Sequence, residues 1–150
     1  MIVFLDTGIL GFLTHPKDGV DPRECKQWLR DLLLAGAEVR VPEIADYELR
    51  RELVRHKSLK AIERLDELGK LVGYVPISTL SIRRAAAFWA TARNSGMPTA
   101  DDKALDGDVI LAAQVVTANH QGHEPLVATT NVKHLERFVK ARLWRDVKPR

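Results

Sequence analysis

Four consecutive apolar residues, Ile2–Leu5, stand directly before an aspartate, Asp6. A run that is apolar at every position has to be covered on both faces, which is typical of a central strand in a parallel sheet packed between helices. Residues 126–129 form a similar run and are also interpreted as a buried strand. Segments with apolar side chains three and four positions apart alternate with such runs and predict amphipathic helices. The pattern therefore predicts a three-layer α/β/α domain around a mainly parallel sheet of four to five strands.

Start and stop signals along the chain place the other elements. Asp or Ser before an apolar stripe, Pro at the first helical position and Gly after the last turn mark helix ends. Further strands are predicted over residues 38–41, 74–77 and 143–147, and no element is predicted over residues 8–20. Helices are predicted over residues 21–36, from 42 to about 56, from 58 to between 69 and 73, from Ser78 or Ser81 to 96, from a capping box at Thr99 and Asp102 to 118, and over 132–139.

The 150 residues contain no linker and no internal repeat, which predicts one domain, 1–150. No apolar run approaches the roughly 18 residues of a membrane span. The single cysteine, Cys25, excludes an internal disulfide framework and a Cys-based zinc cluster, and its amphipathic surroundings predict an inert thiol. We therefore expect an intracellular, cytoplasmic protein that does not bind membranes. Lys and Arg outnumber Asp and Glu by 23 to 20, a surplus compatible with a polyanionic partner without requiring one.

Polar residues follow two of the predicted buried strands. In open parallel sheets, chemistry collects at the carboxyl ends of the strands, and Asp6 lies at such an end. Asn131 occupies the matching position after the strand over residues 126–129. Each residue also has an interpretation without a functional role: Asp6 as a helix cap or turn residue, and Asn131 as a turn or N-cap residue. Both residues are candidates for one site at this edge of the sheet.

A third candidate, Asp108, precedes a helical run over residues 109–116 that is apolar on nearly all sides, with Gln114 as the exception. An ionised carboxylate on such a helix needs a cation or several hydrogen-bond donors to offset its desolvation. Helix N-terminal amides are the structural alternative for Asp108. Asp106 lies on nearly the opposite side of a helical wheel, so the two aspartates are not expected to share a site.

The fourth candidate is Glu48, one helical turn after Ile44 on the apolar flank of its predicted helix. Glu52, one turn further on, is an alternative candidate. From the spacing alone, a glutamate on the solvent-exposed side of a helix is as good an interpretation as a metal ligand. Together, Asp6, Glu48 and Asp108 are able to form a site of hard oxygen ligands. Carboxylates without Cys or paired His suit Mg²⁺ or Mn²⁺ better than Zn²⁺.

Other sequence signatures are missing or incomplete. The chain has no P-loop, no GxGxxG, no HExxH and no GxSxG motif. Asp6-Thr7-Gly8 resembles the aspartic protease signature, but those folds are all-β, whereas this chain has capped amphipathic helices. An aspartyl phosphatase needs a second acid two residues after Asp6, where Gly8 stands. These classes are excluded.

Four segments, residues 4–7, 42–49, 105–113 and 129–135, carry a family resemblance over nearly the whole chain. In this order they resemble the PIN domain, specifically the VapC-like ribonuclease toxins of bacterial and archaeal toxin–antitoxin pairs. The third segment is the most specific. By position, the resemblance implies that Asp6, Glu48 and Asp108 are catalytic, metal-binding acids. Asn131 matches a catalytic position where the family carries Asp or Asn, so a fourth acid is absent here, and Thr7 and Thr129 match supporting hydroxyl residues.

The function implied by this resemblance is hydrolysis of RNA phosphodiester bonds by a Mg²⁺-dependent endoribonuclease, with Mn²⁺ as a substitute. The implied role is that of the toxin in a type II toxin–antitoxin pair, with RNA as substrate, a cognate antitoxin protein as partner, and a homodimeric assembly. The alternative is a catalytically weak PIN-like module that binds RNA or protein. Asn131 favours this alternative, and the three acids oppose it.

Basic residues concentrate in two segments, residues 50–64 and 133–150. They are interpreted either as a solvated helix surface or as a surface for nucleic acid. The candidates for contacts to an RNA backbone are Arg50, Arg51, Arg55 and Lys133. Binding through such contacts should weaken steeply with salt.

Overall fold

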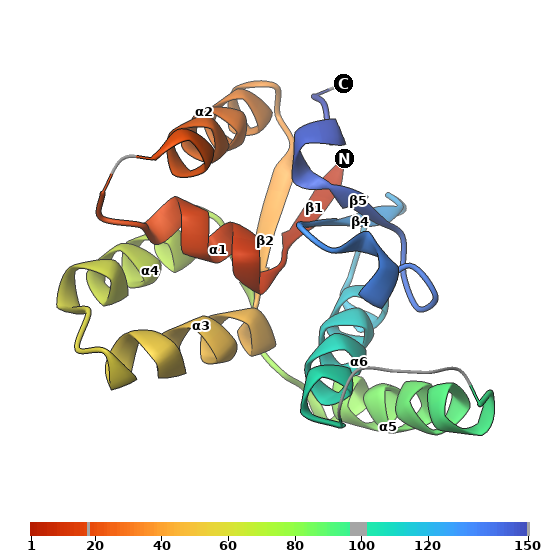
Figure 1. The fold of residues 1–150 in the computed structure, drawn as a ribbon. Coiled ribbons are helices and arrows are strands. Elements are labelled where there is room, and N and C mark those ends of the chain that lie inside the picture. The colour runs from red at the N-terminus through yellow and green to blue at the C-terminus, as the bar shows by residue number, and fades with distance from the viewer. Residues whose placement is uncertain (18, 97–101, 150) are drawn as a thin grey trace.

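A computed structural model describes residues 1–17, 19–96 and 102–149 of the chain (Figure 1). Within these residues, one all-parallel sheet has the strand order β3-β2-β1-β4-β5. The strands are β1 (Ile2–Leu5), β2 (Glu38–Pro42), β3 (Gly73–Val75), β4 (Pro125–Thr129) and β5 (Ala141–Leu143). The helices are α1 (Thr7–Thr14), α2 (Val20–Leu34), α3 (Glu43–Arg55), α4 (Leu59–Leu71), α5 (Thr79–Asn94) and α6 (Asp102–Thr117), and two short 3₁₀ helices cover Val132–His134 and Trp144–Asp146. The predicted fold class is confirmed.

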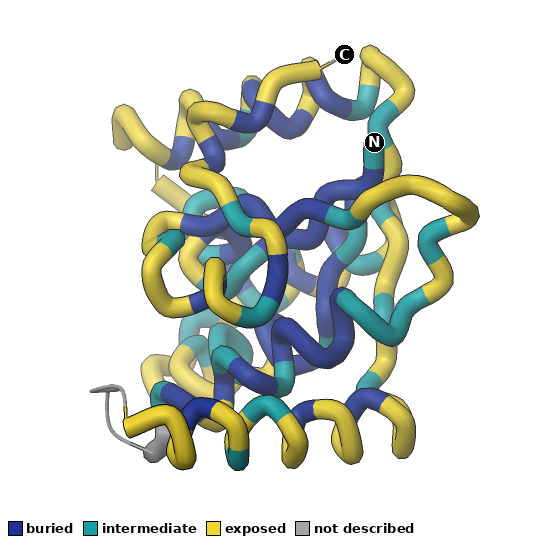
Figure 2. The backbone as a smooth tube through the Cα atoms, turned by 90° about the vertical axis from the view of Figure 1, so that its right-hand side faces the viewer, coloured by how far each residue is buried: buried dark blue, intermediate teal, exposed yellow. Residues whose placement is uncertain are grey.

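The central strand β1 explains why helices lie on both faces of the sheet. Successive side chains of a strand point to opposite faces. Val3 and Leu5 pack in one apolar cluster with α1, α2 and α4, while Ile2 and Phe4 pack in another with α6. All four side chains are buried, as the uninterrupted apolar run predicts. Figure 2 shows buried backbone concentrated in the middle of the molecule and exposed residues along its outer helices.

Helix α6 is buried on two sides because it lies between the sheet and α5. Leu111 and Val115 pack toward the sheet, and Val109 and Ala113 pack toward α5. Its buried polar residue, Gln114, joins two other elements. The side-chain amide accepts a hydrogen bond from the Ile44 backbone N–H at 3.0 Å and donates one to the Val75 carbonyl oxygen at 2.8 Å. These bonds tie the first turn of α3 to the end of β3, and so help to fix the helix that carries Glu48.

The sequence pattern did not predict α1. Its two glycines, Gly8 and Gly11, lower the intrinsic helix propensity of this short segment. Tertiary packing compensates for this, because Ile9 and Leu10 are fully buried against the sheet. Asp6 caps the helix by accepting a hydrogen bond from the Thr7 backbone N–H at 2.7 Å. The cap interpretation of Asp6 is therefore confirmed.

Two predictions for the C-terminal third are wrong. The helix predicted over residues 132–139 is a 3₁₀ turn, Val132–His134, followed by further turns. Only residues 130–140 connect β4 to β5, whereas a helical crossover between parallel strands needs about a dozen residues or more. The strand predicted over residues 143–147 is also wrong beyond Leu143, where a 3₁₀ turn follows.

The chain after β5 packs on α2 instead of pairing in the sheet. The indole rings of Trp28 and Trp144 meet edge to face, with centroids 5.7 Å apart. The Trp28 indole N–H also donates a hydrogen bond to the Val147 carbonyl oxygen at 2.8 Å. Both tryptophans are buried in this contact.

The remaining elements agree with the predictions to within a few residues. Ser78 caps α5 through a capping box with Ser81, and β3 ends at Val75, before the proline that follows it. The capping box predicted at Thr99 and Asp102 depends on Thr99, which lies outside the described residues. None of the described helices has the length and apolar character required to cross a bilayer.

Candidate active site

Asp6 and Thr129 lie next to each other where β1 and β4 end side by side, and Glu48 and Asp108 approach this point from α3 and α6. The sheet runs from β1 to β2 and β3 on one side and to β4 and β5 on the other. Such a change of direction lies at the carboxyl ends of the two central strands, which is where open parallel sheets bind ligands. The Asp6 backbone N–H donates to the Ala128 carbonyl oxygen at 3.1 Å, which places Asp6 next to Thr129.

Both carboxylate oxygens of Asp6 accept a hydrogen bond. Oδ1 accepts from the Thr7 backbone N–H at 2.7 Å, and Oδ2 accepts from the Thr129 hydroxyl at 2.6 Å. Thr129 is completely buried, so its side chain has little freedom to turn away. The two bonds fix the Asp6 carboxylate at the carboxyl ends of β1 and β4.

Glu48 on α3 lies close to the same point. The Thr7 hydroxyl donates to Glu48 Oε1 at 3.3 Å. Burial raises the pKa of Glu48, the hydrogen bond from Thr7 lowers it, and the negative charge of Asp6 raises it again, with a net increase. Thr7 therefore links two of the three predicted acids, one through its backbone and the other through its hydroxyl.

The sequence left open which glutamate of α3 faces inward. Glu48 is half-buried beside Thr7, whereas Glu52 is exposed. Glu52 forms an ion pair with Arg55 at 2.8 Å on the outer surface of α3. The geometry therefore favours Glu48 as the inward-facing acid.

Asp108 on α6 is a third carboxylate near Asp6 and Glu48. The pKa of Asp108 is raised to about 7, first because the group is desolvated and then because of the charges of Asp6 and Glu48. Arg137 opposes this increase. Because α6 begins at Asp102, Asp108 lies beyond the first turn, where the free helix amides are found. Helix amides therefore do not account for this carboxylate.

The outer side of Asp108 faces the loop after β4. His134 Nδ1 lies 3.6 Å from Asp108 Oδ2.

Asp106, by contrast, is exposed, as expected from its position on the other side of the helix. Asn131 is also exposed, and its backbone N–H donates to the Thr129 hydroxyl oxygen at 3.0 Å. Among the described residues, the Asn131 side chain has no hydrogen-bond partner.

A divalent cation is a chemically suitable partner for these three acids. Asp6, Glu48 and Asp108 come from three separate elements, and two of their pKa values are raised by burial and mutual repulsion. Hard oxygen donors of this kind suit Mg²⁺ or Mn²⁺. In their present positions, no three His, Cys, Asp or Glu side chains of the described ranges are grouped closely enough to hold one ion.

The basic residues predicted to contact RNA have different environments. Arg50 is committed to the protein, since it bonds Asp46 at 2.8 Å and also Asp66 at 2.8 Å. Arg55 pairs with Glu52 in the exposed ion pair described above. Arg51 lies over the ring of Tyr47, with its guanidinium carbon 5.3 Å from the ring centroid. Lys133 is exposed in the loop after β4.

Three residues of the site were not singled out from the sequence, namely Gly107, His134 and Arg137. Gly107 packs directly against the Glu48 carboxylate. A glycine inside a predicted helix weakens that helix and so points to a packing or functional reason, which made this residue detectable in principle. His134 and Arg137 were placed on a helix that does not exist, and only the turns after β4 bring them near Asp108.

Cys25 lies outside the site. It is buried in α2, and this burial raises the pKa of its thiol to about 12. The thiol therefore stays protonated near neutral pH, consistent with the predicted inert role.

Comparisons with solved structures show the same fold. VapBC2 from Rickettsia felis, bound to a DNA fragment from its promoter, superposes with a TM-score of 0.72 at 18% identity, covering 96% of this chain and 99% of that chain. FitAcB from Neisseria gonorrhoeae superposes with a TM-score of 0.70 at 20% sequence identity, covering 97% of this chain and 99% of that chain. VapBC-1 from nontypeable Haemophilus influenzae superposes with a TM-score of 0.63 at 18% sequence identity, covering 97% of this chain and 100% of that chain.

The sequence comparisons identify the family. No curated protein matches the sequence. The family model of the PIN domain matches residues 3–138, a range that contains all the candidate acids and both supporting threonines. The chain belongs to the PIN domain family.

Proposed function

We propose that this protein is a divalent-metal-dependent endoribonuclease that uses Mg²⁺, and that it acts as the toxin of a type II toxin–antitoxin pair. The observation that carries the nuclease proposal is the raised pKa of Asp108, about 7, which results first from burial and then from the charges of Asp6 and Glu48. An uncompensated cluster of acids would repel a phosphate backbone, so a counter-charge is needed before RNA is able to approach. Membership of a nuclease family supports the same conclusion.

The residues of the chain have separate roles in this proposal. Asp6, Glu48 and Asp108 would hold the cation, and Thr7 and Thr129 would keep two of these carboxylates in place through hydrogen bonds. When bound, the cation would polarise a phosphodiester and supply a counter-charge to its leaving oxygen. Asn131 lies at the rim of the site, where its free amide is available to bond a phosphate or ribose oxygen.

Cations near the three acids offer contacts for the RNA backbone. Lys133 and Arg137 belong to the exposed loop after β4, and Arg137 is close enough to lower the pKa of Asp108. Arg51 lowers the pKa of Glu48 from the other side of the site. We therefore favour Arg51, Lys133 and Arg137 as backbone contacts over Arg50, whose guanidinium is bound by Asp46 and Asp66.

The toxin role and the antitoxin partner rest on the solved VapBC and FitAcB structures, together with a groove beside the acids. This groove has a volume of about 590 Å³ and lies between α1, α3 and α4. Its apolar lining includes Phe12, Leu49, Leu53 and Ala61. A partner segment bound there would lie directly next to Thr7 and Glu48 and would restrict access to the site.

A homodimer is the assembly that we propose. Ile82 and Trp89 on α5 are 44% and 38% exposed, and they border a shallow apolar depression formed by α5 and α6. Covering this surface with a second copy would remove two large apolar side chains from water. Light scattering should give twice the mass of one chain, and a monomer alone would contradict the proposed assembly.

The nuclease proposal is tested by RNA cleavage with purified protein in Mg²⁺ and in EDTA. Cleavage should require Mg²⁺ and should be lost in Asp6→Asn. The matched control is Asp106→Asn, which removes an exposed carboxylate from the same region of α6 and should cleave like the wild type. Equal cleavage by Asp6→Asn would reject the assigned site. Binding of RNA without cleavage would favour the catalytically weak module.

The toxin role needs a separate test in cells. Expression of the wild-type chain without an antitoxin should arrest growth, and Asp6→Asn should relieve the arrest. Unhindered growth with active enzyme present would contradict the toxin role but leave the nuclease proposal intact.

A further inference from the structure

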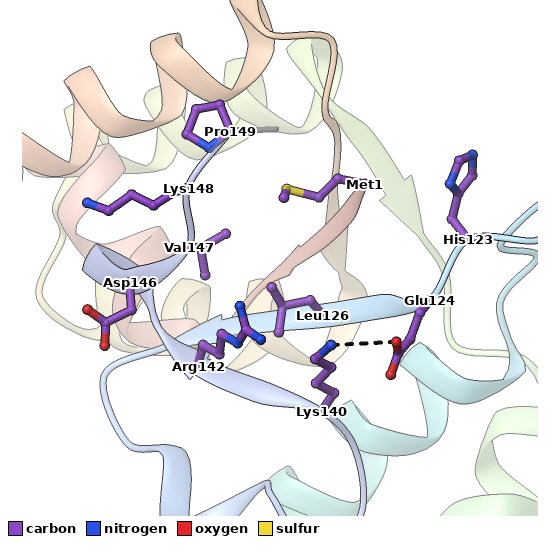
Figure 3. Close-up of a pocket in the computed structure, with 10 residues that line it drawn as sticks. All are labelled: Met1, His123, Glu124, Leu126, Lys140, Arg142, Asp146, Val147, Lys148 and Pro149. Atoms are coloured by element: carbon purple, nitrogen blue, oxygen red, sulfur yellow. Dashed lines mark hydrogen bonds and ion pairs between the residues drawn. The ribbon is translucent and has the colours of Figure 1, made fainter.

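A second pocket lies at the opposite end of the sheet from the acids (Figure 3). It has a volume of about 310 Å³ and is bounded by the amino ends of β1 and β4, by β5 and by the segment that follows β5. Leu126 of β4 lines this pocket, whereas Thr129 at the other end of the same strand bonds Asp6. The volume is at the lower end of the range for small-molecule sites, roughly 300–1,000 Å³.

The pocket combines apolar contacts with cations. Met1, Leu126 and Val147 provide apolar surface, and the latter two are buried. Lys140, Arg142 and Lys148 supply positive charge. Figure 3 shows the Arg142 side chain directed toward Leu126. The site therefore has an apolar part and a cationic part side by side.

Arg142 is a cation of this pocket that is available to a ligand. Its guanidinium makes no hydrogen bond or ion pair with any residue that the structure describes. The two acids of the pocket do not neutralise it, because Glu124 pairs with Lys140 at 3.5 Å and the Asp146 side chain points away from Arg142 in Figure 3. Both side chains of the Lys140–Glu124 ion pair are exposed to solvent. Because exposed ion pairs contribute little to stability, Lys140 is able to leave Glu124 and bind a ligand anion.

We propose that this pocket binds one phosphate-bearing nucleotide, with its phosphate on Arg142 and Lys140 and its base against Met1, Leu126 and Val147. The planar guanidinium of arginine matches the oxygens of a phosphate in a two-bond arrangement. The apolar residues favour a ligand that also carries a flat ring over a bare inorganic anion. The ligand is either a free mononucleotide or the phosphorylated end of an RNA chain, which share this chemistry.

The proposal is tested by calorimetric titration of the full chain with adenosine monophosphate in EDTA, repeated with Asp6→Asn. Binding with one site per chain is expected in both proteins, weakening as salt is raised. Arg142→Ala should weaken binding about tenfold or more, since it removes charge-assisted hydrogen bonds. The matched control is Arg83→Ala on α5, an exposed arginine far from this pocket in sequence, which should bind like the wild type. Because no metal and no cleavage are involved, the outcome is independent of the nuclease proposal.

Two further ligands separate the alternatives. Inorganic phosphate should bind more weakly than the nucleotide, and equal affinities would overturn the assignment of a nucleotide. A short RNA with a 5′ phosphate should bind more tightly than the same RNA without it if the natural ligand is a chain end, whereas binding of the mononucleotide alone assigns the pocket to a free nucleotide. No saturable binding at millimolar concentration, or unchanged binding in both Arg142→Ala and Lys140→Ala, would overturn the proposal.

Discussion

The backbone of Gly107 and the carboxylate of Glu48 are packed so closely that a β-carbon at position 107 would lie 2.7 Å from Glu48 Oε2. It would also lie 3.1 Å from the carboxyl carbon. Only glycine leaves room for Glu48 to lie against α6, one residue before Asp108. The contact therefore helps to bring an acid of α3 next to an acid of α6.

Gly107→Ala should reduce RNA cleavage roughly 10- to 100-fold, because it displaces the Glu48 carboxylate from its position beside Asp108. The free energy of unfolding should change by less than about 1 kcal/mol, because a flexible side chain is able to move aside and Ala favours helix over Gly by a similar amount. Cleavage kinetics and thermal unfolding measure the two effects. Gly11→Ala is the matched control, since a β-carbon there meets nothing within 4 Å. Normal cleavage by Gly107→Ala would show that this contact does not position Glu48.

Replacing the two neighbouring glutamates of α3 should have opposite outcomes. Glu48→Gln should lower cleavage about 100-fold or more, because loss of a carboxylate ligand removes several kcal/mol of charge stabilisation. Glu52→Gln should cleave like the wild type, since Glu52 pairs with Arg55 on the outer surface. Single-turnover cleavage at saturating Mg²⁺ distinguishes them. A greater loss of cleavage in Glu52→Gln than in Glu48→Gln would mean that Glu52, and not Glu48, is the acid of the site.

The raised pKa of Asp108 predicts a specific pH dependence of stability without metal. Between the ordinary value of 3.8 and the folded-state value of about 7, the folded protein binds more protons at this group than the unfolded chain. The contribution of Asp108 to the free energy of unfolding of the protein should therefore decrease as pH rises from about 4 to about 7. In EDTA, Asp108→Asn should be more stable than the wild type at pH 8, by on the order of 2 kcal/mol, and this advantage should disappear near pH 4.

Mg²⁺ should reverse this difference. A ligand that binds only the folded state stabilises it, so Mg²⁺ should raise the melting temperature of the wild type and have less effect on Asp108→Asn. Thermal unfolding at pH 4 and pH 8, with and without Mg²⁺, provides the measurement. Parallel pH profiles of the two proteins would show that Asp108 has an ordinary pKa.

Thr129→Val should weaken both folding and catalysis. The substitution leaves Asp6 Oδ2 without the hydroxyl donor at 2.6 Å and the Asn131 backbone N–H without its acceptor. An unsatisfied buried polar group costs about 1–3 kcal/mol, which should appear as a lower midpoint in urea unfolding. Thr117→Val is the matched control, because its hydroxyl only donates back to the Ala113 carbonyl oxygen within α6. Equal midpoints for the two variants would mean that Thr129 adds nothing beyond an ordinary threonine.

Local patterns in the sequence were sufficient for most of the fold. The apolar run Ile2–Leu5 predicted a strand covered on both faces, and Val3 and Phe4 do pack in different cores. The helix α1 escaped prediction because two glycines weaken its local signal, while the burial of Ile9 and Leu10 that stabilises it is a tertiary effect. Residues 132–139 showed helical spacing, but the connection to β5 is too short for a helix.

The sequence by itself determined which residue types stand at strand ends and on buried helices, since burial and periodicity are encoded locally. It therefore indicated Asp6, Asp108 and a glutamate of α3 as candidates. Only the tertiary structure decided that Glu48 faces Thr7 while Glu52 pairs with Arg55, and that Arg50 is bound by Asp46 and Asp66. It also decided that Asp108 is partly buried near Asp6 and Glu48, and this burial, followed by the charges of those two acids, raises its pKa. These outcomes depend on distances between elements far apart in the chain, and packing sets those distances.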